Sequence, residues 1–110
     1  MKFRVEYFSS KVEDAISDWP IDILADYEHL ITLLEKYGPE LGMPHSFPLG
    51  HGLFELRAKG KEGIGRAFYC FMIGQKVMVL HEIIKKTRKA PKKELDTARN
   101  RMKEVKKWTP

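Results

Sequence analysis

A run of basic residues in the second half of the chain is the part of the sequence best suited to chemistry. The segment LHEIIKKTRKAPKKEL, residues 80–95, begins as an apolar strand and then becomes strongly basic. Residues 85–93 contain no Asp or Glu. Such a cluster is either a solvated turn or a surface that binds an anionic partner. Its six basic residues are Lys85, Lys86, Arg88, Lys89, Lys92 and Lys93.

Two arginines are expected close to this run. Arg57 ends the strand-like segment LFELR, and Arg66 follows the Gly- and Lys-rich stretch AKGKEGIG near the start of GRAFYCFMI. In an antiparallel pair the end of one strand faces the start of the next, so the arginines should be neighbours at one edge of a sheet. The strand over residues 76–84 would return to that edge and deliver residues 81–86 there.

These side chains suit chemistry on an RNA phosphate. Guanidinium groups bind phosphate bidentately and stabilise charge that develops on it. A lysine among other cations has its charged form disfavoured, so a neutral amine can act as a base. Tyr69 and His81 could stack on a nucleobase or exchange protons. A plainer interpretation remains open, in which the arginines form structural ion pairs and His81 belongs to the core.

Composition predicts one globular domain, residues 1–110, with a basic second half. Residues 1–56 hold 4 Lys and Arg against 10 Asp and Glu, whereas residues 57–110 hold 16 against 5. This asymmetry favours an anionic partner, with nucleic acid first. The single cysteine, Cys70, excludes an intrachain disulfide and is expected to be buried. His45 and His51 lack further ligands nearby, so neither a metal site nor a cofactor is expected.

The sequence gives no sign of export or membrane insertion. The first residues, MKFRVEYFSS, carry charges where a signal peptide would be apolar. No apolar run approaches the roughly 20 residues that span a bilayer. We therefore expect a cytoplasmic protein without a membrane partner.

Hydrophobic periodicity predicts the elements that position these residues. The fold class is α+β, with an N-terminal strand and helical hairpin packed on a small, mostly antiparallel sheet, and with a C-terminal helix. The two helices of the hairpin are expected on one face of the sheet. A two-residue turn at Gly74–Gln75 should join the two long strands. The expected segments are a strand over 2–8, a helix over 9–19, a helix between Pro20 and Gly38, a loop over 38–52, strands over 53–57, 65–73 and 76–84, and a helix opened by Pro91.

Three motifs carry a family resemblance. They are GLFELR at residues 52–57, Arg66 and Tyr69 within GRAFYCF, and VLHEIIKKTRKAPKKELDTARNRM at residues 79–102. The pattern HxxxKKTxKxP, residues 81–91, is the most specific part. Together they resemble the RelE/ParE toxin superfamily, and most closely the phage-related, HigB-like branch of toxins from type II toxin–antitoxin systems. The resemblance extends over residues 1–107 in the order of the elements, and over residues 52–101 in the motifs themselves.

The resemblance implies a microbial-ribonuclease-like fold and ribosome-dependent cleavage of mRNA. In such enzymes the ribose 2′-OH attacks the adjacent phosphate in line without a metal, and a cyclic phosphate and a 5′-OH result. The implied partners are a cognate antitoxin, often with a helix-turn-helix, mRNA on the ribosome, and ribosomal RNA. The basic helix from Lys92 to Lys107 would contact ribosomal RNA.

The same resemblance implies a set of site residues. The arginines would stabilise the phosphorane, Lys85 or Lys86 would act as base or clamp, and His81 and Tyr69 would donate protons or stack on bases. The implied catalytic residues are Arg57, Arg66, His81, Lys85 and Lys86. The implied RNA-binding residues are Lys59, Lys61, Tyr69, Thr87, Arg88, Lys89, Lys92 and Lys93.

Departures from the family pattern leave alternatives open. Glu82, Ile83 and Ile84 stand where relatives usually have a small residue and an aromatic, so a stacking position near His81 is lost. One alternative function is ParE-like inhibition of DNA gyrase without nuclease activity. Another is a non-catalytic module that binds RNA or an antitoxin. Retention of both arginines and of the KKT run favours the nuclease.

Overall fold

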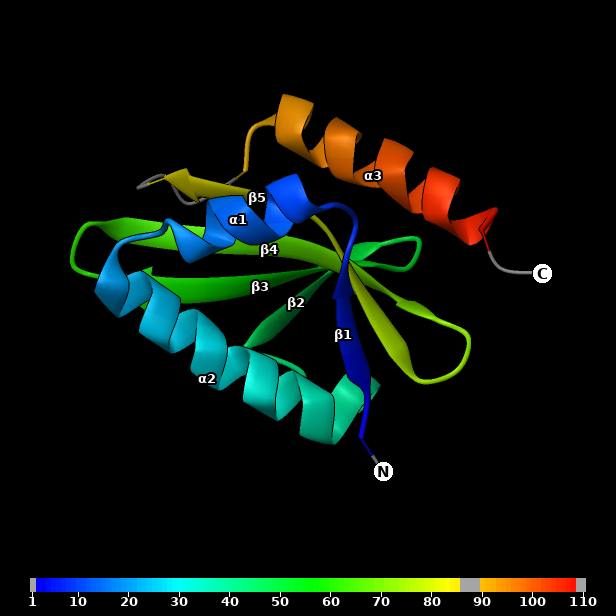
Figure 1. The fold of residues 1–110 in the computed structure, drawn as a ribbon, viewed down its shortest axis with the longest axis horizontal. Helices are drawn as coiled ribbons and strands as arrows, with labels where there is room; N and C mark the ends of the chain where they lie inside the picture. Colours follow the sequence, from blue (N-terminus) through cyan, green and yellow to red (C-terminus); the bar gives the residue numbers. More distant parts are fainter. Residues whose placement is uncertain (1, 86–89, 109–110) are drawn as a thin grey trace.

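The structure, a computed structural model, describes residues 2–85 and 90–108, with Lys85 described by its backbone alone. Figure 1 shows the order of the elements, in which one strand precedes two helices, four strands follow, and a helix ends the chain. A short 3-10 helix over Gly38–Glu40 comes after the second helix. The elements are β1 (Arg4–Tyr7), α1 (Ser10–Ser17), α2 (Ile21–Tyr37), β2 (Ser46–Gly50), β3 (Leu53–Gly60), β4 (Gly63–Met72), β5 (Lys76–Lys85) and α3 (Lys92–Lys106).

One five-stranded sheet organises the fold, with its strands in the order β1-β5-β4-β3-β2. β1 runs parallel to β5, and the other neighbouring pairs are antiparallel. The α+β class with a mostly antiparallel sheet is therefore confirmed. None of the helices in the described part of the chain is long and apolar enough to cross a bilayer.

The two helices of the hairpin share one face of the sheet, as expected, and the C-terminal helix lies on the other face. α1 and α2 cover one face, and α3 covers the other (Figure 1). The physical reason lies in β4, where residues 65–70 are buried without interruption. A strand that is apolar on both faces needs cover on both faces. Cys70 is buried on the α3 face, as expected.

Residues 38–52, expected to be a loop, contain the edge strand β2 as well as the 3-10 helix. Pro48 is tolerated in β2 because an edge strand has one side without ladder hydrogen bonds. β2 pairs with only the first part of β3. Side chains of α2 bind the backbone N–H groups along the rest of that edge. Asp26 Oδ2 accepts the Lys59 N–H and Asp22 Oδ2 accepts the Lys61 N–H, both at 2.7 Å. These bonds help β3 and β4 to extend through the Gly- and Lys-rich stretch.

Two details of the β4–β5 hairpin differ from the expected geometry. Met72 pairs with Lys76, so the turn contains three residues instead of two. A β-bulge lies beyond it at Leu80, because Tyr69 pairs with Val79 and Phe68 pairs with His81. A bulge moves the next side chain to the other face of a sheet. His81 consequently shares the α3 face with Phe68.

Trp19, between α1 and α2, packs tightly against the sheet. Its ring is held by an edge-to-face contact with Tyr27, with centroids 5.5 Å apart, and Nε1 donates to Glu82 Oε1 at 2.9 Å. Gly65 of β4 lies directly beneath the ring, and a Cβ added there would come within 2.5 Å of Trp19 Cζ3. Trp19 therefore requires glycine at this position.

We expect Gly65→Ala to destabilise the protein by about 1–3 kcal/mol, because the fixed ring of Trp19 cannot yield to the new methyl group. In a Trp19→Leu background the same change should cost much less, since the obstructing ring is gone. Urea unfolding of the four proteins of this cycle measures the difference. An equal cost in both backgrounds would show that the ring is not the obstacle.

Candidate functional site

Arg57 and Arg66 are direct partners in the β3–β4 ladder, which confirms that the two arginines are neighbours. A carboxylate that the sequence did not single out, Glu55 of β3, lies between them. Arg57 Nε donates to Glu55 Oε1, and Arg66 Nε lies 3.6 Å from Glu55 Oε2. One carboxylate thus joins two guanidinium groups on the α3 face of the sheet.

The two arginines differ sharply in burial. The Arg66 side chain is 0% exposed and that of Glu55 is 3% exposed, whereas the Arg57 side chain is 30% exposed. Burial lowers the pKa of the Arg66 guanidinium, the nearby charge of Arg57 acts in the same direction, and Glu55 opposes both. Arg66 is a fixed interior charge, and Arg57 is the arginine that reaches the surface.

An aromatic ring on β2 completes the environment of Arg57. The guanidinium carbon of Arg57 lies 3.7 Å from the centroid of the Phe47 ring, a close cation–π contact. Phe47 pairs with Glu55 in the β2–β3 ladder, so the strand register brings the ring and the carboxylate together. Arg57 is therefore held from two directions, through its Nε by Glu55 and across one face by Phe47.

A small hollow of about 260 Å³ opens beside this group. Glu55 and Arg57 form its polar part. Leu49 of β2, together with Ala90 and Leu95 from the start of the α3 region, forms apolar walls. The Arg57–Glu55 ion pair thus borders an accessible space whose other walls are apolar.

His81 lies in the contact between β5 and α3. Its Nε2 is 2.6 Å from Glu94 Oε1, and its Nδ1 is 3.4 Å from Nη1 of Arg101. Phe68 stacks along the ring, with centroids 6.1 Å apart. Side chains of α3 contact both ring nitrogens, and Phe68 covers one face of the ring. This geometry fits the alternative interpretation of the sequence, in which His81 has a structural role in the core.

The structure does not bring Tyr69 to the site. Tyr69 is 1% exposed, points to the α1/α2 face of the sheet, and hydrogen-bonds through its hydroxyl to Ser46. Burial raises the pKa of Tyr69 to about 12, although the bond to Ser46 acts in the opposite direction. This placement does not fit the expected stacking of Tyr69 on RNA, because alternation along β4 puts Tyr69 and Arg66 on opposite faces of the sheet.

The lysines of the candidate site are spread along the surface. Lys59 and Lys61 are exposed at the β3–β4 turn. Lys92 and Lys93 are exposed in the first turn of α3, where Lys92 Nζ lies 2.9 Å from Asp96 Oδ2. The backbone of Lys85 pairs with Ile64, two residues before Arg66. The remaining predicted site residues, Lys86, Thr87, Arg88 and Lys89, lie outside the described residues.

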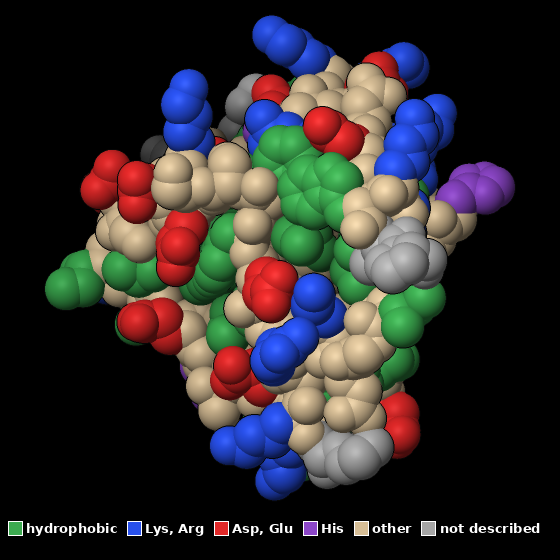
Figure 2. Space-filling model, turned by 45° about the vertical axis from the view of Figure 1, so that its right-hand side comes forward, with side chains coloured by type: hydrophobic (Ala, Val, Ile, Leu, Met, Phe, Trp, Pro, Cys, Tyr) green, Lys and Arg blue, Asp and Glu red, His purple; other side chains and the backbone are tan. Residues whose placement is uncertain are grey.

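Several basic residues of α3 hold the helix on the sheet. Arg99 donates to the carbonyl oxygens of Leu49 and Gly50, Arg101 donates to that of Leu80, and Lys106 donates to that of Phe71. The positive charge of α3 is therefore partly structural. Figure 2 shows Lys and Arg side chains gathered at the top right, where α3 lies, while Asp and Glu side chains are more frequent at the left.

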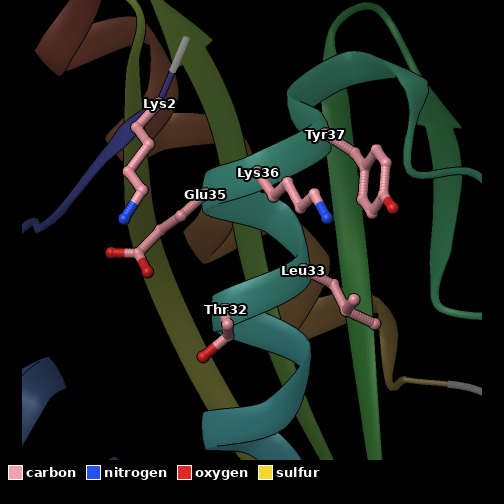
Figure 3. A pocket seen from close by; sticks show the side chains of 6 residues that line it. All are labelled: Lys2, Thr32, Leu33, Glu35, Lys36 and Tyr37. Atoms are coloured by element: carbon pink, nitrogen blue, oxygen red, sulfur yellow. The ribbon is translucent and has the colours of Figure 1, made fainter.

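A larger hollow, of about 620 Å³, lies away from this site at the end of α2. Figure 3 shows that its side chains diverge, with Thr32 and Glu35 on one side of the helix and Leu33 and Tyr37 on the other. They do not converge on a common point. Within residues 2–85 and 90–108, no group of three or more His, Cys, Asp or Glu lies close enough to hold a metal ion.

Glu55 and Phe47 are the site residues that sequence reasoning missed. For Glu55 a signal existed, because it precedes Arg57 by two positions and so shares its face of a strand. For Phe47 the signal was concealed, because Pro48 and the surrounding glycines suggested a loop. The candidate site therefore contains an acidic and an aromatic side chain as well as the basic residues.

Comparisons with known proteins match the chain to a protein family and to solved structures. The family model for phage-derived Gp49-like proteins matches residues 14–103. Among solved structures, the chain is similar to the archaeal RelE–RelB complex from Pyrococcus horikoshii OT3, with a TM-score of 0.53 and 19% sequence identity over 81% of this chain and 100% of that chain. A comparison with curated proteins gives no match.

These matches agree with the residue pattern described above. At 19% identity the archaeal structure shows the fold alone, and the fold is that of RelE. The family match spans most of the chain and includes the basic run and both arginines. The resemblance to the RelE superfamily is therefore confirmed, while the HigB-like branch stays a prediction. The chain belongs to the family of phage-derived Gp49-like proteins, and it has the RelE toxin fold.

Proposed function

We propose that this protein is the toxin of a type II toxin–antitoxin system and an endoribonuclease that cleaves mRNA on the ribosome. The observation that carries the proposal is the Arg57–Glu55–Arg66 group, which presents one accessible guanidinium beside a hollow. β5 ends next to this group, because Ile83 pairs with Arg66 and the backbone of Lys85 pairs with Ile64. The basic run therefore begins beside the arginines.

The proposed reaction needs no metal ion. The ribose 2′-oxygen attacks the adjacent phosphorus, its proton passes to Lys85 or Lys86, and the P–O5′ bond breaks. The other lysine gives a proton to the leaving 5′-oxygen, so that a 2′,3′-cyclic phosphate and a 5′-OH result. Arg57 stabilises the negative charge that develops on the non-bridging oxygens. Buried Arg66 strengthens the positive field and keeps Glu55 in place.

The charge of this surface indicates the proposed partners. mRNA and ribosomal RNA supply phosphates for Arg57 and for the exposed lysines of α3. The archaeal structure contains a RelE chain with RelB. By analogy, we propose an antitoxin for this chain that covers Arg57 and the adjoining hollow and so blocks access of RNA.

Arg57→Ala should lower the rate of mRNA cleavage by about 10²–10³-fold, because it removes the accessible group that stabilises the transition state. The double variant Lys85→Ala/Lys86→Ala should also abolish growth arrest. The measurement is induction in bacterial cells and then mapping of mRNA 5′ ends.

Lys76→Ala is the matched control for this experiment. It also removes one positive charge from the sheet, but at the opposite end of β5, where Lys76 lies 3.6 Å from Glu6. This variant should retain cleavage. Unchanged cleavage by Arg57→Ala would refute the site assignment, and gyrase-linked DNA breaks with intact mRNA would favour the ParE-like alternative.

Glu55→Gln should destabilise the protein by about 3 kcal/mol, because it removes a charged partner of the buried Arg66 guanidinium. Adding Arg66→Met should recover part of this loss, since it removes that charge. Urea unfolding of the two variants and the original protein measures both effects. If Glu55→Gln were as stable as the original protein, the buried carboxylate would not be what holds the arginines together.

A further inference from the structure

The residues expected to stack on a nucleobase do not offer a free ring at the site. Tyr69 is buried on the opposite face of the sheet, and His81 is covered by Phe68 and engaged by α3. Single-stranded RNA is nevertheless bound largely by stacking of its bases on aromatic rings or on arginine guanidinium planes. The guanidinium of Arg57, which lies over the Phe47 ring, is a planar group that borders the hollow.

We propose that Arg57 is a stacking platform for one unstacked base of the RNA substrate, with Phe47 as the layer beneath it. This inference rests on the proposed function, because it takes RNA as the ligand. The layers would have the order Phe47, Arg57, base. Arg57 would then contribute to substrate positioning through its plane as well as to catalysis through its charge.

The contacts of Arg57 support this arrangement. Phe47 covers one face of the guanidinium at 3.7 Å, and Glu55 accepts from Nε at its edge. These two contacts fix the orientation of the plane before any ligand binds, which lowers the entropic cost of stacking. The side chain remains 30% exposed, so part of the guanidinium stays accessible.

The walls of the hollow also suit a base better than a phosphate alone. Leu49, Ala90 and Leu95 line it with apolar side chains, while Arg57 and Glu55 supply the polar contacts. A base has two apolar faces and a polar edge, whereas a phosphate is polar on every side. The hollow therefore combines a cationic plane with apolar walls, as in other sites that stack single-stranded bases.

The experiment uses mRNAs made uncleavable by 2′-O-methyl groups, with 2-aminopurine at one position at a time. Each RNA is offered free and on a stalled ribosome. 2-Aminopurine fluorescence should fall at one position when the original protein binds, because stacking quenches it. Arg57→Lys keeps the charge without the plane, and Phe47→Leu removes the layer beneath. Both should lose this quenching and bind about tenfold more weakly.

Lys76→Arg is the control, because it changes a basic side chain far from the hollow and should leave quenching unchanged. Arg57→Lys should also keep the salt dependence of binding, since the number of phosphate contacts stays the same. Thermal unfolding measured by circular dichroism verifies that the variants are folded. Quenching by Arg57→Lys equal to that of the original protein would overturn the stacking role.

The outcomes separate this inference from the proposed function. Position-specific quenching that Arg57→Lys abolishes, in a protein that does not cleave unmodified mRNA, supports the platform and refutes the nuclease. Cleavage of unmodified mRNA without quenching at any position refutes the platform and supports the nuclease. Absence of RNA binding, free and on the ribosome, refutes both.

Discussion

The buried carboxylate of Glu55 is the interaction on which the candidate site depends. Arg57 and Arg66 face each other across the β3–β4 ladder, and two guanidinium charges at that separation repel strongly where water is excluded. Glu55 interacts with both and offsets the repulsion. Burying a charge is costly unless it is paired, so the three residues form one unit that keeps net positive charge. The backbone sets their spacing, because Arg57 and Arg66 are ladder partners and Glu55 lies two residues before Arg57 on the same strand.

Burial determines what each arginine can do. Arg66 is fully buried, so in the proposed reaction it would act on a ligand through its field rather than by contact. Arg57 is one strand nearer the edge, where short β2 leaves part of its side chain exposed. The two arginines have the same side chain, but one is buried and the other is accessible to a ligand. Charge alone does not distinguish them, because the difference lies in the strand order and the length of β2.

Features set by local pairing were predictable from the sequence, whereas features that depend on tertiary contacts were missed. The facing arginines were predictable because strand ends meet across a hairpin, and α2 was predictable from its apolar stripe. β2 was missed because Pro48 and nearby glycines resemble a loop. The bulge at Leu80 was missed because nothing local specifies one extra residue in a strand. Basic residues of α3 were assigned to RNA, although three of them bond to backbone carbonyls.

The bulge at Leu80 has a consequence for the basic run. It places His81 on the α3 face and Glu82 on the other face, where they meet different helical layers. His81 lies against Glu94 of α3, and Glu82 accepts from Trp19 beside α2. Two successive residues thus fasten β5 to both layers just before the lysines begin. A catalytic base must be held within hydrogen-bond reach of its proton, so fixing the start of the run from both faces is a structural requirement of the proposed chemistry.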